Sequence, residues 1–281
     1  MDLQGIPLHH NHKAFVDRFV NACIADERVV AAFLGGSYAK GYSDPYSDID
    51  LCVITTDQSF EEFVSQREAF LRSLGDLVFH EDFGNPEVSF YIYAEDTEGE
   101  LNDGRESGLD KIHSGPFKIL VDKTNILAGA IFSPFEPSAP ERVEKLRHLL
   151  FDFWHELSHF MIAMQRNQLW WARGQLESLR SVCVNLARLR NNFLDPEFSE
   201  EAYFKIETVM PVEKLSALVE TFCPMEKEAM LKAGSAVVQF YREIAPLLAI
   251  LHGIEYPSGL ERVMMDRWQK LQAAQVQKEN G

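Results

Sequence analysis

Two aspartates that stand one residue apart, Asp48 and Asp50, are the residues of this chain best suited to chemistry. They enter an apolar run that ends at Thr55 and has the composition of a β-strand. Residues two apart in a strand point the same way, so both carboxylates would face one side, with Cα atoms ~7 Å apart. Neighbouring carboxylates repel each other unless a cation lies between them, and Mg²⁺ accepts one or two carboxylates together with substrate phosphates. The spacing therefore predicts a magnesium site.

A turn suited to phosphate lies shortly before these aspartates. The apolar run 29–34 leads into Gly36 and Ser37, and Lys40 follows. Glycine lets a phosphate approach the backbone because it has no Cβ, and a helical turn beginning at Ser37 would aim free N–H groups at the anion. The serine hydroxyl and the lysine ammonium would add a donor and a positive charge. Each motif alone is common, but the two together predict a nucleotide triphosphate beside a metal.

The strings Leu34-Gly35-Gly36-Ser37 and Ser47-Asp48-Ile49-Asp50-Leu51 resemble the DNA-polymerase-β-like nucleotidyltransferase superfamily. The resemblance implies ATP or another nucleoside triphosphate as donor and two Mg²⁺ ions. It also implies catalytic and metal-binding roles for Asp48 and Asp50. The nucleotide-binding residues that it implies are Gly36, Ser37, Lys40 and Ser47.

The resemblance further implies a third carboxylate on a later strand of the same sheet. Many members carry an aspartate within that strand, where this chain has Ser89. The nearest acid is Glu87, which we take as the third catalytic and metal-binding residue. Asp82 and Glu95 are the alternatives.

The elements that would position these residues follow from hydrophobic periodicity. Helical periods cover 12–26 and 60–74, and short strand-like runs cover 29–34, 50–55, 77–79, 88–93 and 117–121. The acidic, glycine-containing segment 96–108 is typical of a loop or an irregular helix start. Prolines gather at 133–140, and only helical periods follow. The pattern predicts an α+β chain: a nucleotidyltransferase fold with a mixed sheet flanked by helices (1–132), a proline-rich linker (133–140) and a helical bundle (141–281).

This two-domain order resembles antibiotic nucleotidyltransferases of the lincosamide and aminoglycoside 6-adenylyltransferase type. Their acceptor lies between the two domains, and Trp171 and Glu177 are our candidates for substrate contacts in the bundle. His155 and His159 have the i, i+4 spacing of helical metal ligands, but no third ligand is evident. We interpret these histidines as packing residues or polar lining.

The formal net charge is −16, which excludes a protein that wraps a nucleic-acid duplex and is compatible with a cationic small substrate. No run approaches the ~20 apolar residues of a membrane span, and the first residues lack the pattern of a signal peptide. Scattered cysteines without a CxxC spacing are typical of reduced thiols in a cytoplasmic protein. A homodimer is compatible with the sequence.

The sequence thus predicts an enzyme that transfers a nucleoside monophosphate, in the first place AMP, to a hydroxyl of a small molecule. An antibiotic is the favoured acceptor, and pyrophosphate is the second product. Two alternatives remain open: adenylylation of a protein partner, and a regulatory module that binds nucleotide without turnover.

Overall fold

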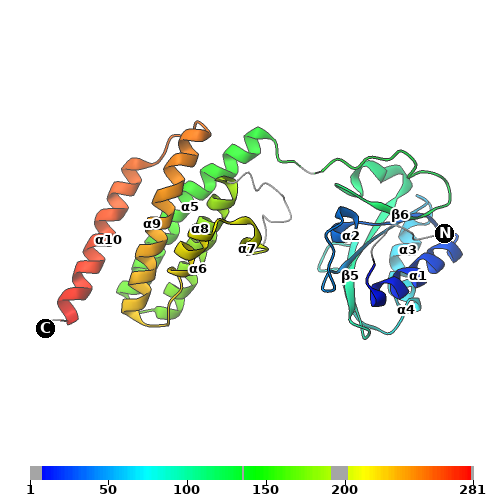
Figure 1. Ribbon diagram of the computed structural model, residues 1–281, viewed down its shortest axis with the longest axis horizontal. Coiled ribbons are helices and arrows are strands. Elements are labelled where there is room, and N and C mark those ends of the chain that lie inside the picture. Colours follow the sequence, from blue (N-terminus) through cyan, green and yellow to red (C-terminus); the bar gives the residue numbers. More distant parts are fainter. Residues whose placement is uncertain (1–7, 135, 191–201, 280–281) are drawn as a thin grey trace. The chain divides into compact units, whose positions relative to one another are not determined.

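The computed structural model describes residues 8–134, 136–190 and 202–279. Tertiary contacts divide the chain into two compact units, Met1–Phe135 and Glu136–Gly281 (Figure 1). Each unit has apolar clusters of its own. Two clusters belong to the first unit and one to the second. The two units are therefore described separately.

The first unit is built on a six-stranded sheet with the strand order β3-β4-β5-β2-β1-β6. Its strands are β1 (Val29–Leu34), β2 (Ile49–Thr55), β3 (Leu77–Glu81), β4 (Val88–Tyr93), β5 (Thr97–Arg105) and β6 (Lys118–Asp122). The pair β2 and β5 is parallel, whereas the other neighbouring pairs are antiparallel. The sheet is therefore mixed, as the sequence predicted.

One face of this sheet is covered by helices. They are α1 (His10–Ala25), α3 (Phe60–Ser65) and α4 (Arg67–Ser73), and all three contribute buried aromatic side chains to the larger cluster (Figure 1). The opposite face is covered beside β1 and β2 by a smaller cluster that includes Leu127 and Phe132. The short helix α2 (Gly36–Lys40) follows β1, and the 3-10 helix η1 (Glu106–Lys111) follows β5.

The central strand β5 is the main difference from the sequence-based expectation, which placed a loop or an irregular helix start at 96–108. Strand propensity is low for Glu, Gly, Asn and Asp, and these residues dominate the segment. The strand forms because it is paired on both sides, with β2 and β4, and because its alternate residues are buried. Gly99 permits this pairing, since a Cβ there would lie 2.1 Å from the carbonyl oxygen of Ile49. Tertiary pairing overrides local propensity at this strand.

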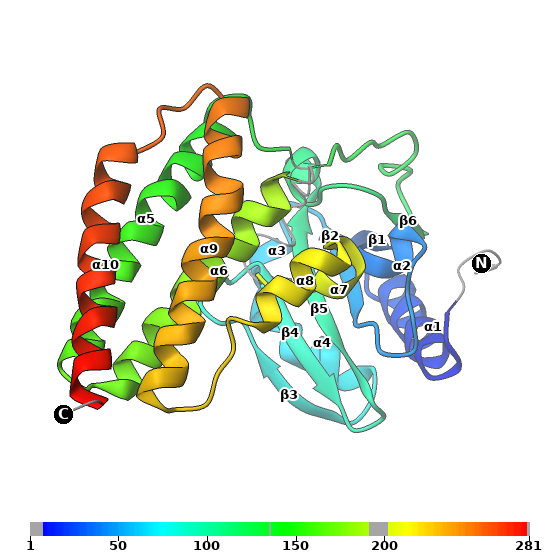
Figure 2. The same cartoon turned by 60° about the vertical axis from the view of Figure 1, so that its left-hand side comes forward.

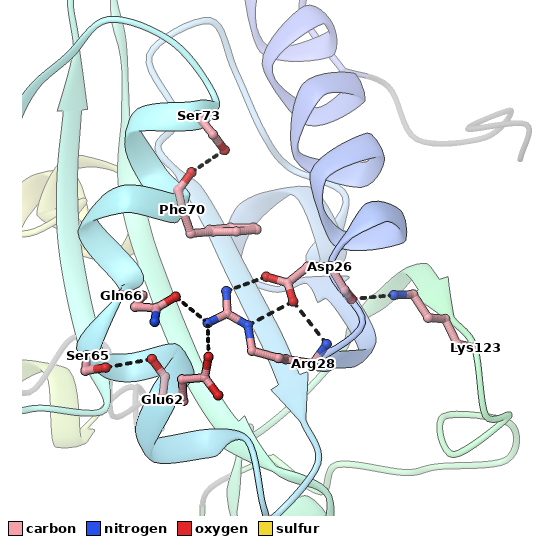
Figure 3. A network of polar contacts seen from close by, with 8 residues as sticks. All are labelled: Asp26, Arg28, Glu62, Ser65, Gln66, Phe70, Ser73 and Lys123. Carbon is pink, nitrogen blue, oxygen red and sulfur yellow. Dashed lines mark hydrogen bonds and ion pairs between the residues drawn. The ribbon is translucent and has the colours of Figure 1, made fainter.

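The predicted helix 60–74 is two helices, because the chain breaks at Gln66 between α3 and α4. The Gln66 side chain accepts a hydrogen bond of 2.8 Å from Arg28, which also forms an ion pair with Asp26 at 2.7 Å (Figure 3). Lys123 donates to the backbone carbonyl of Asp26. This network ties the end of α1, the start of β1 and the α3–α4 break together.

The second unit is helical throughout the residues that the structure describes. It contains α5 (Ala139–Gln165), α6 (Leu169–Arg190), α7 (Ile206–Val209), α8 (Val212–Val219), α9 (Lys227–Leu251) and α10 (Ser258–Glu279). The long helices α5, α6, α9 and α10 run side by side around one apolar cluster (Figure 2). Helix α5 begins with a capping box, in which Ser138 and Glu141 satisfy each other's backbone N–H groups.

The observed architecture confirms the predicted fold class: a mixed sheet flanked by helices, followed by a helical bundle. The proline-rich segment 133–140 reaches into the first turn of α5, where Pro140 lies. A proline is tolerated in this turn because its backbone nitrogen needs no hydrogen-bond partner there. Among the described helices, none combines the length and the apolar character that crossing a membrane requires.

Candidate active site

Asp48 and Asp50 lie at the start of β2, on either side of the fully buried Ile49. Asp50 is the second residue of the strand and is half-buried, whereas Asp48 is exposed just before the strand begins. Their alternation with Ile49 directs both acids to the sheet face opposite α1, α3 and α4. The local arrangement is therefore the one that the spacing predicted.

A third acid joins them from the neighbouring strand β5. Glu100 is the register partner of Asp50 in the parallel pair, so the two side chains lie next to each other on one face. Burial raises the pKa of the Glu100 carboxyl, and the negative charge of Asp48 raises it further. Asp48 precedes Asp50 by two residues and therefore faces the same side of the sheet. The structure thus brings together Asp48, Asp50 and Glu100.

Glu87, the predicted third carboxylate, lies elsewhere on the sheet. Its carbonyl oxygen accepts a hydrogen bond from the backbone of Asp103, three residues beyond Glu100 on β5 and so ~10 Å along the strand. The alternation of β4 assigns Glu87 to the face of the buried Ser89, which is the opposite face from Glu100. The structure does not bring Glu87 to the two aspartates.

The two alternatives for the third carboxylate also lie outside this group. Glu95 forms an exposed ion pair of 2.7 Å with Arg18 of α1. Asp82 accepts a backbone hydrogen bond from Gly84 in the turn between β3 and β4. Both acids are thus engaged in local structure away from Asp50.

Gly36 is fitted directly against the carboxylate of Asp50. A Cβ on Gly36 would lie 1.6 Å from Oδ2 of Asp50, and the backbone φ of +51° is one that other residues rarely adopt. The backbone N–H of Gly35 also donates to the carbonyl oxygen of Asp50, at 2.9 Å. Only glycine allows the turn and the carboxylate to approach this closely. The two predicted motifs are therefore parts of one site.

The hydroxyl of Ser37 supplies an observation that points to a ligand. Its Oγ is buried and has no hydrogen-bond partner among the residues that the structure describes. A buried polar atom without a partner costs free energy, so its presence calls for an explanation. Since Ser37 follows Gly36 at the start of α2, a phosphate oxygen at this turn would satisfy the hydroxyl.

Lys40 and Ser47 frame the loop between α2 and β2. Lys40 is the last residue of α2. The Ser47 hydroxyl accepts a hydrogen bond of 2.9 Å from the backbone N–H of Asp44 and lies 3.3 Å from the Asp44 carboxylate. Ser47 thus holds the turn that leads into Asp48.

This group of side chains suits magnesium and a nucleotide. Asp48, Asp50 and Glu100 offer only oxygen ligands, which hard divalent cations prefer. A cation among them would relieve the repulsion that raises the pKa of Glu100. Gly36 and Ser37 lie on the β1 side of these acids and leave room and a donor for phosphate.

An aromatic surface lies on the other side of the acids. Phe79, Phe83 and Phe90 form a triangle with ring centroids 6.3–6.4 Å apart, and Phe83 is 75% exposed. Phe90 is the register partner of Glu100 and therefore lies on the same face. From β3 to β1, this sheet face therefore carries the aromatic rings, then the three carboxylates, and then the Gly36–Ser37 turn.

The two predicted substrate residues of the helical unit both lie on α6. Trp171 is 37% exposed and packs against His159, whereas its neighbour Trp170 is 85% exposed. Glu177 forms an ion pair with the fully buried Arg180 and accepts a hydrogen bond of 2.7 Å from Tyr203. Glu177 therefore neutralises a buried cation within its own unit.

Sequence reasoning missed Glu100 because it missed β5. A signal was present, since Glu98 and Glu100 alternate with Thr97, Gly99 and Leu101 in the pattern of a half-buried strand. The preceding segment 94–96 forms the turn of a β-hairpin, with Asp96 at a φ of +52°. The acidic, glycine-containing composition favoured a loop or an irregular helix start, and the alternation was not recognised.

The chain was compared with protein families and with known proteins. The sequence model of the family described as streptomycin adenylyltransferase matches residues 10–270. No curated protein matches the sequence. Among solved structures, a crystal structure of an aminoglycoside 6-adenyltransferase from Bacillus subtilis is similar, with 14% sequence identity and a TM-score of 0.45. That match covers 94% of this chain and 98% of the other.

Proposed function

Since the chain belongs to the streptomycin adenylyltransferase family and is a nucleotidyltransferase, we propose that it transfers AMP from ATP to a hydroxyl group of an aminoglycoside antibiotic. The observation that carries this proposal is the meeting of Asp48, Asp50 and Glu100 beside the phosphate turn at Gly36 and Ser37. Nucleotidyl transfer needs these two parts together: anionic ligands for cations, and a cradle for the triphosphate.

The donor half of the reaction belongs to the first unit. Asp48 and Asp50 would hold two Mg²⁺ ions with Glu100, which takes the place of Glu87 as the third carboxylate. Bound magnesium would neutralise the charge of the phosphates during transfer. Gly36 lets the triphosphate approach the backbone, the Ser37 hydroxyl donates to it, and Lys40 and Ser47 complete the surroundings.

Glu100 also suits the acceptor. Its carboxylate lies between Asp50 and Phe90 on one sheet face, where it can accept the proton of a hydroxyl that approaches from the side of β4. In the proposed step, the acceptor oxygen bonds to the α-phosphorus and the bond to pyrophosphate breaks. The hydroxyl proton passes to Glu100.

The acceptor would approach from the side of β4, since the phosphate turn lies on the β1 side. Phe90 and its two aromatic neighbours offer rings against which a sugar or a cationic group can pack. The net charge of −16 would attract a polycationic drug. Trp171 and Glu177 are the proposed acceptor contacts of the helical unit.

The substitution Phe90→Leu tests the aromatic side of the site. We expect it to raise the KM for the antibiotic and to leave the KM for ATP unchanged, because Phe90 lies on the side of Glu100 away from Ser37. Steady-state kinetics with each substrate varied in turn measures both constants. An increase confined to the KM for ATP would contradict this orientation.

The function itself is tested by incubating the protein with ATP labelled on the α-phosphate, Mg²⁺ and a panel of antibiotics. The expected result is release of pyrophosphate and transfer of the label to one aminoglycoside. Asp50→Asn, which removes a carboxylate but no core contact, is the inactive control and should remain folded. Label on a protein substrate instead of a drug would favour adenylylation of a partner. Nucleotide binding without turnover across the panel would favour a regulatory module.

A further inference from the structure

A pair of histidines lies one turn apart on the surface of α5, in the helical unit. The ring centroids of His155 and His159 are 4.3 Å apart. Leu157 and Phe160, on the opposite side of the helix, are fully buried and fix which face of α5 points inward. The two imidazoles are therefore held together on the outer face by the helix itself.

A carboxylate completes the group. Glu156 lies 2.9 Å from Nδ1 of His155, and this hydrogen bond leaves Nε2 of His155 for another partner. One ligand atom from each of the three residues lies within 4.8 Å of the others. His155 and His159 have the i, i+4 spacing that can place two histidines of a helix on one metal ion. Glu156 is the third candidate ligand.

We propose that His155, Glu156 and His159 bind one divalent ion of the zinc, copper and nickel class. Two imidazole nitrogens and a carboxylate oxygen suit these metals, whereas magnesium prefers oxygen ligands. Bonds of about 2.0–2.1 Å from zinc to nitrogen bring two ligand atoms to within ~4.2 Å of each other. Small side-chain rotations close the difference from the observed 4.8 Å. The hydrogen bond between Glu156 and Nδ1 of His155 also fixes the orientation of the ring.

This site differs in chemistry from the magnesium site proposed above and is built from residues of the other unit. Its ligands are nitrogen-rich and come from α5, whereas Asp48, Asp50 and Glu100 offer only oxygen and come from the sheet. Excess Mg²⁺ should therefore occupy the carboxylates and leave the histidines available. The two sites can be measured independently in the intact protein.

A natural reporter lies beside the proposed site. The Trp171 ring centroid is 5.9 Å from that of His159. Paramagnetic Cu²⁺ quenches tryptophan fluorescence at short range, so binding of Cu²⁺ at His159 should quench Trp171. Part of this quenching should disappear in Trp171→Phe, while the amount of Cu²⁺ bound stays the same.

The deciding experiment is calorimetric titration of Zn²⁺ into the full chain, freed of metal with a chelator, in buffer with excess Mg²⁺. We expect a binding event of one Zn²⁺ per chain that is lost in both His155→Ala and His159→Ala. Glu156→Gln should weaken this event. His148→Ala is the matched control, because His148 is also an exposed histidine of α5 and should leave binding unchanged.

Circular dichroism shows whether each variant is folded, which matters most for the half-buried Glu156 and His159. Zn²⁺ binding that persists in both His155→Ala and His159→Ala would overturn the proposal. Absence of binding to the parent chain would overturn it as well. Neither result would bear on nucleotidyl transfer, which is measured by the release of pyrophosphate.

Discussion

Gly36 of the glycine-serine turn lies directly against the carboxylate of Asp50, so the two motifs of the site are in contact. A glycine in a phosphate turn is usually explained by access for the ligand. Here the same glycine is also required by the protein, because the Asp50 carboxylate occupies the position that a Cβ would take. The identity of one residue is therefore fixed by the position of another that comes later in the chain.

Gly36→Ala is expected to abolish transfer, because the added methyl group displaces the Asp50 carboxylate. Gly41→Ala is the matched control. Gly41 also has a positive φ, +82°, but a Cβ there would meet nothing within 4 Å. Both variants should lose ~1–3 kcal/mol of stability from backbone strain, and only the first should lose activity. Thermal denaturation and a pyrophosphate assay separate the two effects, and equal activity of the two variants would refute this explanation.

The identity of the third carboxylate is also decided at the level of single residues. We expect Glu100→Gln to reduce kcat by about 100-fold or more, which is the lower range for removal of a group that takes a proton. Glu87→Gln should behave like the parent protein, because Glu87 lies on the opposite face of the sheet. Glu98→Gln removes an acid from the same strand and controls for the change of charge. Full activity of Glu100→Gln together with loss in Glu87→Gln would restore the original choice.

At the scale of elements, the site depends on how β2 is placed between β1 and β5. The strand β1 ends at the phosphate turn, β2 begins with the two aspartates, and β5 supplies Glu100. The Asp26–Arg28 network fixes the beginning of β1, since Arg28 precedes Val29 and reaches across to Gln66 (Figure 3). This network lies outside the site and anchors the start of β1, the strand that leads into the Gly36–Ser37 turn.

The pH dependence of stability should report on this network. The hydrogen bond from Arg28 lowers the pKa of Asp26 below its ordinary value. The ionised Asp26 therefore stabilises the fold above the ordinary carboxyl pKa of about 4, and this contribution is lost as the pH falls through the lowered folded-state pKa. We expect Asp26→Asn to be less stable than the parent by roughly 1–2 kcal/mol at pH 7. The difference should close as the pH falls below 4.

Thermal denaturation of both proteins between pH 3 and pH 7 checks this expectation. Asp17→Asn is the control, because Asp17 lies on α1, which ends just before Asp26, in an exposed ion pair with Lys13. Exposed pairs contribute little, so this variant should resemble the parent protein at every pH. A stability difference for Asp26→Asn that does not change with pH would show that the charge is not responsible.

At the scale of the whole molecule, the chain consists of two units with separate apolar cores. The first unit carries the carboxylates and the phosphate turn. The second carries the proposed zinc-class site and the buried Arg180–Glu177 pair. Since each core is complete within its unit, the boundary near Phe135 is the proposed point of division.

We expect fragments 1–135 and 136–281 each to fold cooperatively when expressed alone, because the contacts that bury their cores are internal. Circular dichroism during heating should show one sigmoidal transition for each fragment. In the second fragment, Leu176→Asp places a charge in the core and should remove the transition. A non-cooperative signal from either unmodified fragment would show that the units need each other to fold. The first fragment should bind nucleotide without transferring it.

The sequence by itself determined the fold class, and it predicted the local geometry of the two aspartates and of the Gly36–Ser37 turn, because these are local patterns. Strand alternation fixes where Asp48 and Asp50 point, and apolar periods distinguish the sheet half from the helical half. Only the tertiary structure decided that an acidic segment becomes the central strand β5, since its stability comes from pairing on both sides. That pairing, which joins residues far apart in the chain, placed Glu100 beside Asp50 and left Glu87 on the other face.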